Sequence, residues 1–222
     1  NYMNILVGSF EERLRKSISF AWEIFSEQVG ATLLSINKEA SMQLHYSYIL
    51  QQILPLVCFS KNESAKIELE TGVIVQGRSR EIDLVLRGRA EGLIYNIAVE
   101  MKCYRKKTSS GGKRGATDIF MKDVYEDLHL LESYCHRDSF DNEKSVFNAG
   151  VALVMNDLDR LVNPKSKVAK CWDYDISNGT KVSDLHLTTP IGGKTVDLKI
   201  RKCYAFKWIK KGEFWFLENE GV

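Results

Sequence analysis

The apolar residues near the start of the chain recur at intervals of three and four. Seven of them between Phe10 and Val29 form one stripe, and Ser9 and Glu12 stand ahead of it at the spacing of a capping box. A stripe with this period buries one face of a helix, while the capping box satisfies free backbone groups at its start. The pattern therefore predicts an N-terminal helix over residues 9–29.

A second helical stripe runs from about Glu39 to Leu54, where Pro55 enforces an end because its ring clashes with the preceding turn. Beyond it the period changes from 3.6 to 2, which is typical of strands. Turns are expected at 76–79 and 88–92. The alternating runs predict an antiparallel meander of three strands, at residues 67–75, 82–86 and 97–103.

The third strand leads into a loop that contains only basic charges and a Ser-Ser-Gly-Gly centre. After it, Thr117 or Asp118 is expected to cap a third helix with an apolar stripe from Phe120 to Leu131. The acidic residues of this helix are assigned to its solvent side: Asp123, Glu126, Asp127 and Glu132. A continuous apolar run over residues 149–155 predicts a strand in the middle of the sheet, buried on both faces.

The last third of the chain is less regular. Residues 167–176 and 196–207 are predicted strands, and a turn at 210–212 leads into another at 214–217. We therefore expect a single α/β domain over residues 1–222. Its parts are the N-terminal helix 9–29, a core at about 39–156 and a β-rich C-terminal extension at 157–222.

Composition adds limits on partners and location. Thirty-one basic and 29 acidic residues leave a net charge of +2, so any polyanion would have to meet a local basic patch. The five cysteines form no C-x-x-C pair, which favours a reducing, cytoplasmic location. Uncharged apolar runs fall far short of the ~20 residues of a membrane helix, so no membrane association is expected.

Candidate chemistry lies on the second and third predicted strands. Because strand side chains alternate, Glu100 and Lys102 share one face while Met101 points to the other. Asp83 faces away from Ile82 and Leu84, so the register that aligns the polar faces places it beside Glu100. Two carboxylates and an ammonium then converge, and carboxylate oxygens suit a hard ion such as Mg²⁺.

Asp83 followed by Glu100-Met101-Lys102 resembles the motif of the PD-(D/E)xK nuclease superfamily, with Ile82 where the family name has proline. The resemblance covers roughly residues 39–155, including the element order. It implies a restriction-endonuclease-like αβββαβ core with a mixed central sheet. It also implies that Asp83 and Glu100 bind Mg²⁺, helped by the backbone carbonyl of Met101, and that Lys102 positions or activates the attacking water.

Other candidates are weaker. Many members of the family add an acidic or amide residue from the preceding helix, and Glu39 or Gln43 could fill that place, although Glu39 would equally suit a helix start. Asp197-Leu198-Lys199 repeats the acid-x-Lys form without a following helix. Cations near the proposed metal could contact nucleic-acid phosphates: Arg105, Lys106, Lys107, Lys113, Arg114 and Lys122.

The function expected from this resemblance is a Mg²⁺-dependent endonuclease that hydrolyses phosphodiester bonds in DNA, with Mn²⁺ able to substitute. By analogy, restriction or phage defence would fit, as would a homodimer or a partner subunit. The alternative is a nuclease fold with a weak or inactive site that serves as a nucleic-acid-binding or assembly subunit. A small-molecule α/β enzyme is disfavoured because the chain has no G-x-G-x-x-G, P-loop or G-x-S-x-G motif.

Overall fold

The computed structural model describes residues 4–108, 110–136 and 146–222 and shows an α/β protein built on a six-stranded mixed sheet. Its strand order is β1-β2-β3-β4-β10-β9. The neighbours β3 and β4 are parallel, and the other neighbouring pairs are antiparallel. The bounds are β1 Ser64–Val75, β2 Arg78–Ala90, β3 Leu93–Tyr104, β4 Ala149–Asn156, β9 Ile209–Lys211 and β10 Phe214–Asn219.

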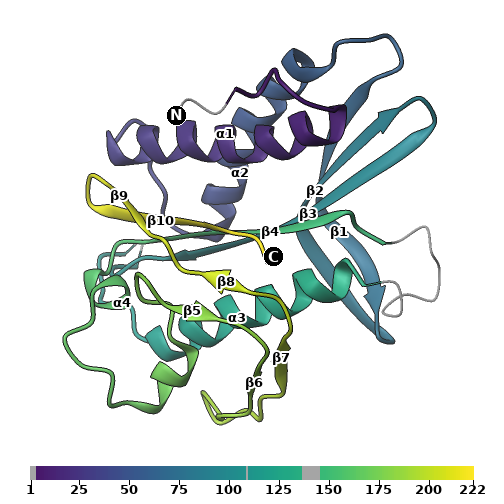
Figure 1. Ribbon diagram of the computed structural model, residues 1–222. Coiled ribbons are helices and arrows are strands. Elements are labelled where there is room, and N and C mark those ends of the chain that lie inside the picture. The colour runs from purple at the N-terminus through teal and green to yellow at the C-terminus, as the bar shows by residue number, and fades with distance from the viewer. Residues whose placement is uncertain (1–3, 109, 137–145) are drawn as a thin grey trace.

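Helices cover both faces of this sheet (Figure 1). Helices α1 (Phe10–Gly30) and α2 (Glu39–Ile53) lie on one face, and α3 (Thr117–Tyr134) lies on the other. The predicted capping box of α1 is present, and Pro55 follows α2 within the short 3₁₀ helix η1 (Leu54–Val57). The helix and strand periods of the sequence are therefore confirmed over most of the predicted core.

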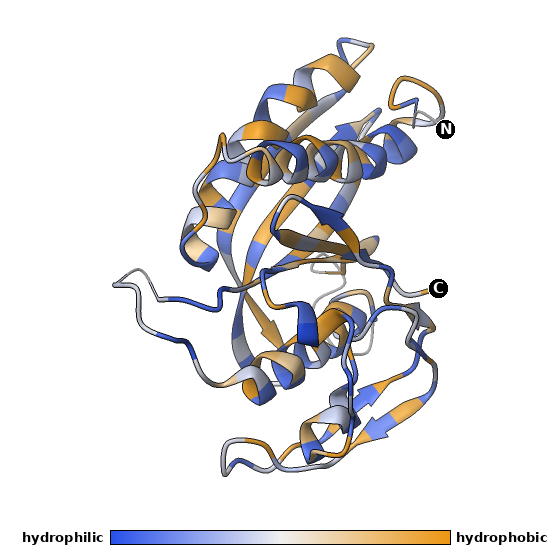
Figure 2. Ribbon diagram, turned by 90° about the vertical axis from the view of Figure 1, so that its left-hand side faces the viewer, coloured by the Kyte–Doolittle hydropathy of each residue, from blue (hydrophilic) through white to orange (hydrophobic). Residues whose placement is uncertain are grey.

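Two hydrophobic cores result, one on each side of the sheet. The α1/α2 core takes Val99 and Met101 from β3, whereas the α3 core takes Ala98 and Tyr104 from the same strand. Apolar residues gather between the layers, and hydrophilic residues follow the outer surfaces (Figure 2). Strand β4 contributes to both cores between β3 and β10, which confirms the predicted buried central strand.

Two local predictions within the core are wrong. Gly88 was expected in a turn but lies in β2, and the turn is confined to Glu91 and Gly92. A Cβ at Gly88 would lie 2.1 Å from the Leu14 side chain, so this glycine allows α1 to approach the sheet. The start of α3 also differs, because its N-cap is Ala116 with φ +60° and no side-chain cap.

The C-terminal segment completes the central sheet, because β10 pairs with β4 and β9 forms the edge. The predicted strand at 167–176 is wrong, since this segment holds a 3₁₀ helix that buries Tyr174 against Tyr125 of α3. The expected long strand at 196–207 is divided into β7 and β8. The smaller elements are α4 Asp159–Val162, η4 Lys170–Tyr174, β5 Lys181–Val182, β6 Leu185–Leu187, β7 Leu198–Ile200 and β8 Tyr204–Ala205.

Among the residues that the structure describes, no helix has the length and apolar character needed to cross a bilayer.

Candidate active site

Strand β3 places its polar side chains as the alternation predicted. Val99 and Met101 pack in the α1/α2 core, so Glu100 and Lys102 face the opposite side, toward α3. Two contacts with α3 support this orientation. Tyr134 Oη donates a hydrogen bond to Glu100 Oε1 at 3.0 Å, and Lys102 Nζ forms an ion pair with Asp127 Oδ2 at 3.4 Å.

Asp83 lies where β2 separates from β3. The two strands pair from Ala90–Leu93 to Leu84–Val99, and β3 continues alongside β4. The backbone N–H of Met101, which lies beyond the last β2–β3 pair, donates to Asp83 Oδ2 at 2.6 Å. The carboxylate thus replaces a missing ladder partner, which fixes its position next to Glu100.

The expected regular alternation of β2 around Asp83 is wrong. Ile82 packs in the α3 core, whereas Leu84 packs in the α1/α2 core, although the two are separated by a single residue. On β1, Glu70 has φ +50°, a conformation uncommon for a residue with a side chain. The inner faces of both strands therefore switch sides at this level, although the pairing register is unchanged from Leu69–Leu84 to Thr71–Ile82, and the hairpin curves away from the sheet (Figure 1).

The carboxyl groups of Asp83 and Glu100 are close enough to share a hydrogen bond. Glu100 is only 5% exposed, and Asp83 is half-buried. Gln43 Nε2, one turn into α2, donates to the backbone oxygen of Asp83 and to Glu70 Oε1, each at 2.7 Å. The amide therefore fixes the backbone of the bend, and its contact with Asp83 is through the main chain.

Lys102 lies among carboxylates from both helical layers. Its Nζ is 3.6 Å from Glu39 Oε1 and 3.4 Å from Asp127 Oδ2. The other Glu39 oxygen accepts from the backbone N–H of Cys103 at 3.4 Å. We refer to the group formed by Glu39, Asp83, Glu100, Lys102 and Asp127 as the acid–lysine cluster.

The cluster has four carboxyl groups and one ammonium, and this imbalance affects its titration. Burial, followed by the charges of Asp127 and Asp83, raises the pKa of Glu100 well above its ordinary value. Burial likewise raises the pKa of Asp127 to about 8 and raises the pKa values of Asp83 and Glu39. Protons are therefore retained in the cluster near neutral pH, because several buried carboxylates cannot all ionise around one cation.

Lys102 shows the opposite balance. Burial by itself would lower its pKa, but the surrounding carboxylates outweigh burial and raise the pKa above that of a free lysine. The ammonium therefore stays protonated at physiological pH. It can orient a water molecule or stabilise negative charge, but it does not act as a general base.

Two members of the site were missed from the sequence. Asp127 was assigned to the solvent side of α3 but is only 7% exposed, so that assignment is wrong. Its position, three residues after Val124 and four before Leu131, lies on the apolar stripe and could have revealed its burial. Tyr134 ends the same stripe, and nothing in the sequence indicated its bond to Glu100.

Asp83 and Glu100 are the residues of the cluster that could hold Mg²⁺. Within the described residues, no group of three or more His, Cys, Asp or Glu side chains is arranged to hold a metal ion. Asp83 and Glu100 nevertheless provide adjacent carboxyl oxygens. Mg²⁺ commonly binds through one or two carboxylates and keeps several waters, so this pair, with the carbonyl of Met101 nearby in sequence, fits a magnesium site.

The predicted nucleic-acid contacts fall into two groups. Arg105 Nε pairs with Asp157 at 2.9 Å and its guanidinium lies over the Phe214 ring, while Lys122 pairs with Asp123 and Glu126. These two cations are thus engaged within the protein. The remaining four have exposed side chains on the loop, namely Lys106, Lys107, Lys113 and Arg114.

The second acid-x-Lys sequence, Asp197-Leu198-Lys199, lies outside the site. Asp197 is exposed and pairs with His186 at 2.6 Å on a two-stranded sheet. Asp197 therefore forms a surface contact with His186 and takes no part in the acid–lysine cluster.

The chain matches no protein-family model, no curated protein and no solved structure. The geometry of the acid–lysine cluster is therefore the basis for assigning a function.

Proposed function

We propose that the chain is a Mg²⁺-dependent phosphodiester hydrolase that cuts DNA, with the acid–lysine cluster as its active site. The observation that carries the proposal is the packing of four carboxyl groups around one ammonium where β2 leaves β3. A buried ion cluster that served only stability would balance its charges, because an unpaired buried charge is costly. An excess of carboxyl groups favours a cation as the missing component.

The fold offers a second line of support. The order α2, β1, β2, β3, α3, β4, with β3 and β4 parallel, agrees with the αβββαβ core of the restriction-endonuclease-like fold. The proposed site also lies at the point of strand divergence, where side chains from two strands and two helices can reach one phosphate. We therefore propose that finer fold as well.

The residues take separate roles in this proposal. Asp83, Glu100 and the Met101 carbonyl would hold Mg²⁺, which when bound offsets the negative charge that develops on the phosphoryl oxygens. The ammonium of Lys102 orients the attacking water and donates to a phosphoryl oxygen. Glu39 Oε1, 3.6 Å from that ammonium on a side chain that is 41% exposed, is placed to accept the proton of the water.

Tyr134 acts as a positioning residue. Its hydroxyl donates to Glu100 Oε1 at 3.0 Å, which holds this carboxyl group in place beside Asp83. An outer hydrogen bond of this kind orients a ligand and tunes its affinity for metal.

Cleavage of supercoiled plasmid tests the proposal. Purified protein is incubated with Mg²⁺, with Mn²⁺ and with a chelator, and we expect nicked or linear product only with metal. Glu100→Gln and Lys102→Ala should each lower the rate by at least ~100-fold, because both groups act on the transition state. DNA affinity should persist, since phosphate contacts away from the reacting atoms dominate it.

Glu81→Gln provides a matched control, because this exposed carboxylate on β2 lies outside the cluster. It should cut at the wild-type rate. Wild-type protein that binds DNA but cuts with neither metal would contradict the proposal and support the non-catalytic alternative. Thermal melts of each variant separate lost chemistry from lost folding.

A further inference from the structure

A cleft of about 590 Å³ lies between the tip of the β1–β2 hairpin, helix α3 and residues 194–198. We refer to it as the hairpin cleft. Its charged walls consist of the cations Arg78, Arg80, Lys122 and Lys194 and the acids Glu126 and Asp197.

Both acidic side chains of the hairpin cleft are already engaged. Glu126 pairs with Lys122 at 2.7 Å, and Asp197 pairs with His186 at 2.6 Å. Neither forms an ion pair with Arg78, Arg80 or Lys194 in the described part of the chain.

The remaining cations have no such partners. In the described part of the chain, the side chains of Arg78 and Lys194 form neither a hydrogen bond nor an ion pair, and both residues are exposed. Arg80 is half-buried, and its Nε is buried without a hydrogen-bond partner. A buried donor left unsatisfied is costly, so an acceptor oxygen from outside the chain would complete it.

The hairpin cleft adjoins the acid–lysine cluster. The pKa of Glu126 is lowered by the charges of both Arg80 and Lys102, so this residue lies within reach of the cleft and of the cluster. The charge of Arg80 also reaches Tyr134, whose hydroxyl donates to Glu100. The two sites therefore lie along the same stretch of α3.

We propose that the hairpin cleft binds a backbone phosphate of the DNA strand being cut, with Arg80, Arg78 and Lys194 as its donors. This inference rests on the proposed function and adds the path of the substrate. The DNA would then contact two basic regions, the loop that precedes α3 and the hairpin cleft beside α3. Guanidinium groups suit this role because they donate paired hydrogen bonds to phosphate oxygens.

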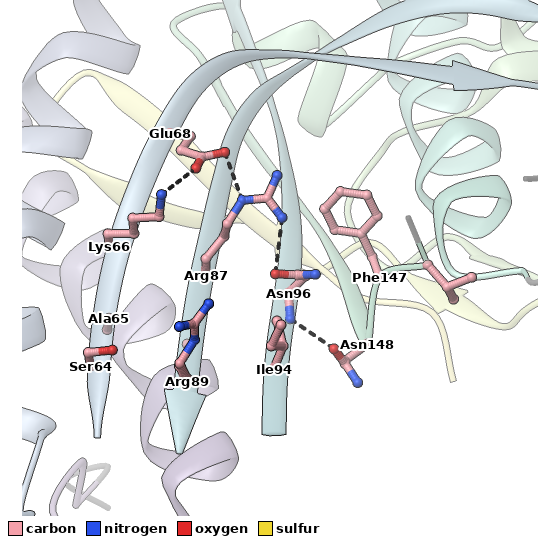
Figure 3. Close-up of a pocket in the computed structure, with 12 residues that line it drawn as sticks. Ser64, Ala65, Lys66, Glu68, Arg87, Arg89, Ile94, Asn96, Phe147 and Asn148 are labelled. Carbon is pink, nitrogen blue, oxygen red and sulfur yellow. Dashed lines mark hydrogen bonds and ion pairs between the residues drawn. The ribbon is translucent and has the colours of Figure 1, made fainter. Parts of the chain in front are cut away.

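A larger groove on the sheet provides the comparison (Figure 3). It measures about 1050 Å³, but Glu68 already pairs with Lys66 at 2.8 Å and Arg87 at 2.7 Å, and Arg87 Nη1 donates to Asn96 at 3.2 Å. Two of its three cations, Lys66 and Arg87, are thus already engaged within the protein. This region serves as a control surface, because its lining has the same formal charge as that of the hairpin cleft.

The test measures DNA binding with metal removed by chelator, so the result does not depend on cleavage. The cleft variant combines Arg78→Ala, Arg80→Gln and Lys194→Ala. The control variant combines Lys61→Ala, Lys66→Ala and Arg89→Ala, which removes the same charge at the other end of β1 and β2. Anisotropy of a labelled duplex is followed across a salt series, and melts confirm that each variant is folded.

The cleft variant should bind at least ~10-fold more weakly at 0.1 M salt, and the salt slope should fall by about 0.9 for each lost phosphate contact. The control should stay within about twofold of wild type. An equal effect in both variants, or none in the cleft variant, would overturn the inference. The double variant Arg78→Ala with Lys194→Ala keeps the test valid if the change at Arg80 impairs folding.

Two further outcomes separate this inference from the proposed function. Binding that depends on the cleft in a protein that never cuts DNA would support the cleft and refute the nuclease. Cleavage by the cleft variant with unchanged KM would refute the cleft alone. If wild type binds inorganic pyrophosphate through these residues but not DNA, the occupant is a free anion and the DNA path is overturned.

Discussion

Replacing Asp127 by asparagine should change how folding stability depends on pH. In the folded chain, burial raises the pKa of Asp127 to about 8, against 3.8 for an ordinary aspartate. The folded state therefore holds a proton that the unfolded state releases. The resulting stabilisation is fully present below pH 3.8 and is lost as pH rises through about 8, so the ionised carboxyl opposes folding in alkaline solution.

The size of the effect follows from these two values. They differ by about four pH units, and each unit corresponds to about 1.4 kcal/mol, which sets an upper limit of about 5 to 6 kcal/mol. That pKa already includes the attraction of Lys102 at 3.4 Å, but part of the shift comes from neighbouring carboxyl groups that titrate together with Asp127. We expect about half of the limit, roughly 2 to 3 kcal/mol.

The assay is urea unfolding of wild type and Asp127→Asn at several pH values from about 4 to about 9. The free energies of unfolding should be similar at the acid end, and the variant should become the more stable protein as pH rises through the window. Asp123→Asn is the matched control, because Asp123 lies on the same helix with a side chain that is 33% exposed. It should change the free energy of unfolding by less than about 1 kcal/mol, because a partly exposed ion pair contributes little. A flat difference for Asp127→Asn, or a variant less stable at pH 8.5, would refute the burial and charge assignment.

Two further predictions concern stability. Arg13→Ala should cost about 3 kcal/mol in urea unfolding, because Arg13 is buried, pairs with Glu63 at 2.8 Å and also binds two backbone oxygens. The control Glu23→Ala, at an exposed position of the same helix, should change stability by less than about 0.5 kcal/mol, and equal effects would contradict this view. Gly212→Ala should cost at least about 2 kcal/mol, because Gly212 has φ +56° and its Cβ would lie 2.3 Å from a carbonyl oxygen at the end of α1. Gly179→Ala, with φ +86° and open space, should cost about 1 kcal/mol, and a larger loss there than at Gly212 would count against the packing argument.

Strand β3 could be predicted well because it obeys one local rule. One face of this strand packs in the α1/α2 core and the other in the α3 core, so the period of two holds from Ile97 to Tyr104. That period alone predicted that Glu100 and Lys102 lie on the same face of the strand. Local periodicity sufficed where the surroundings of the strand were uniform.

The bend at Asp83 could not be predicted in the same way. It depends on β2 parting from β3 and on Glu70 adopting a positive φ across the hairpin. Both are consequences of tertiary packing, because the two strands must serve the α1/α2 core at one end and the α3 core at the other. The sequence predicted that Asp83 lies beside Glu100, but it did not predict the bend in β2 that places it there.

The C-terminal third shows a similar limit. The run Phe214 to Leu217 was recognised as a strand, but its pairing with β4 links residues about 60 positions apart in sequence. Residues 167–176 alternate like a strand, but the burial of Tyr174 against α3 favours a 3₁₀ turn. Long-range pairing and aromatic packing decided these elements, and neither is encoded by local period.

Binding of a divalent cation by Asp83 and Glu100 underlies the proposed cleavage of DNA. Calorimetric titration of the DNA-free protein with Mn²⁺ at neutral pH measures it directly. Wild type should bind with release of protons, since burial raises the pKa of Glu100 and a metal ligand must be ionised. Asp83→Asn and Glu100→Gln should each abolish binding, whereas Glu81→Gln should bind as wild type does. Equal Mn²⁺ binding by wild type and Glu100→Gln, or no binding by the folded wild type, would contradict the assignment.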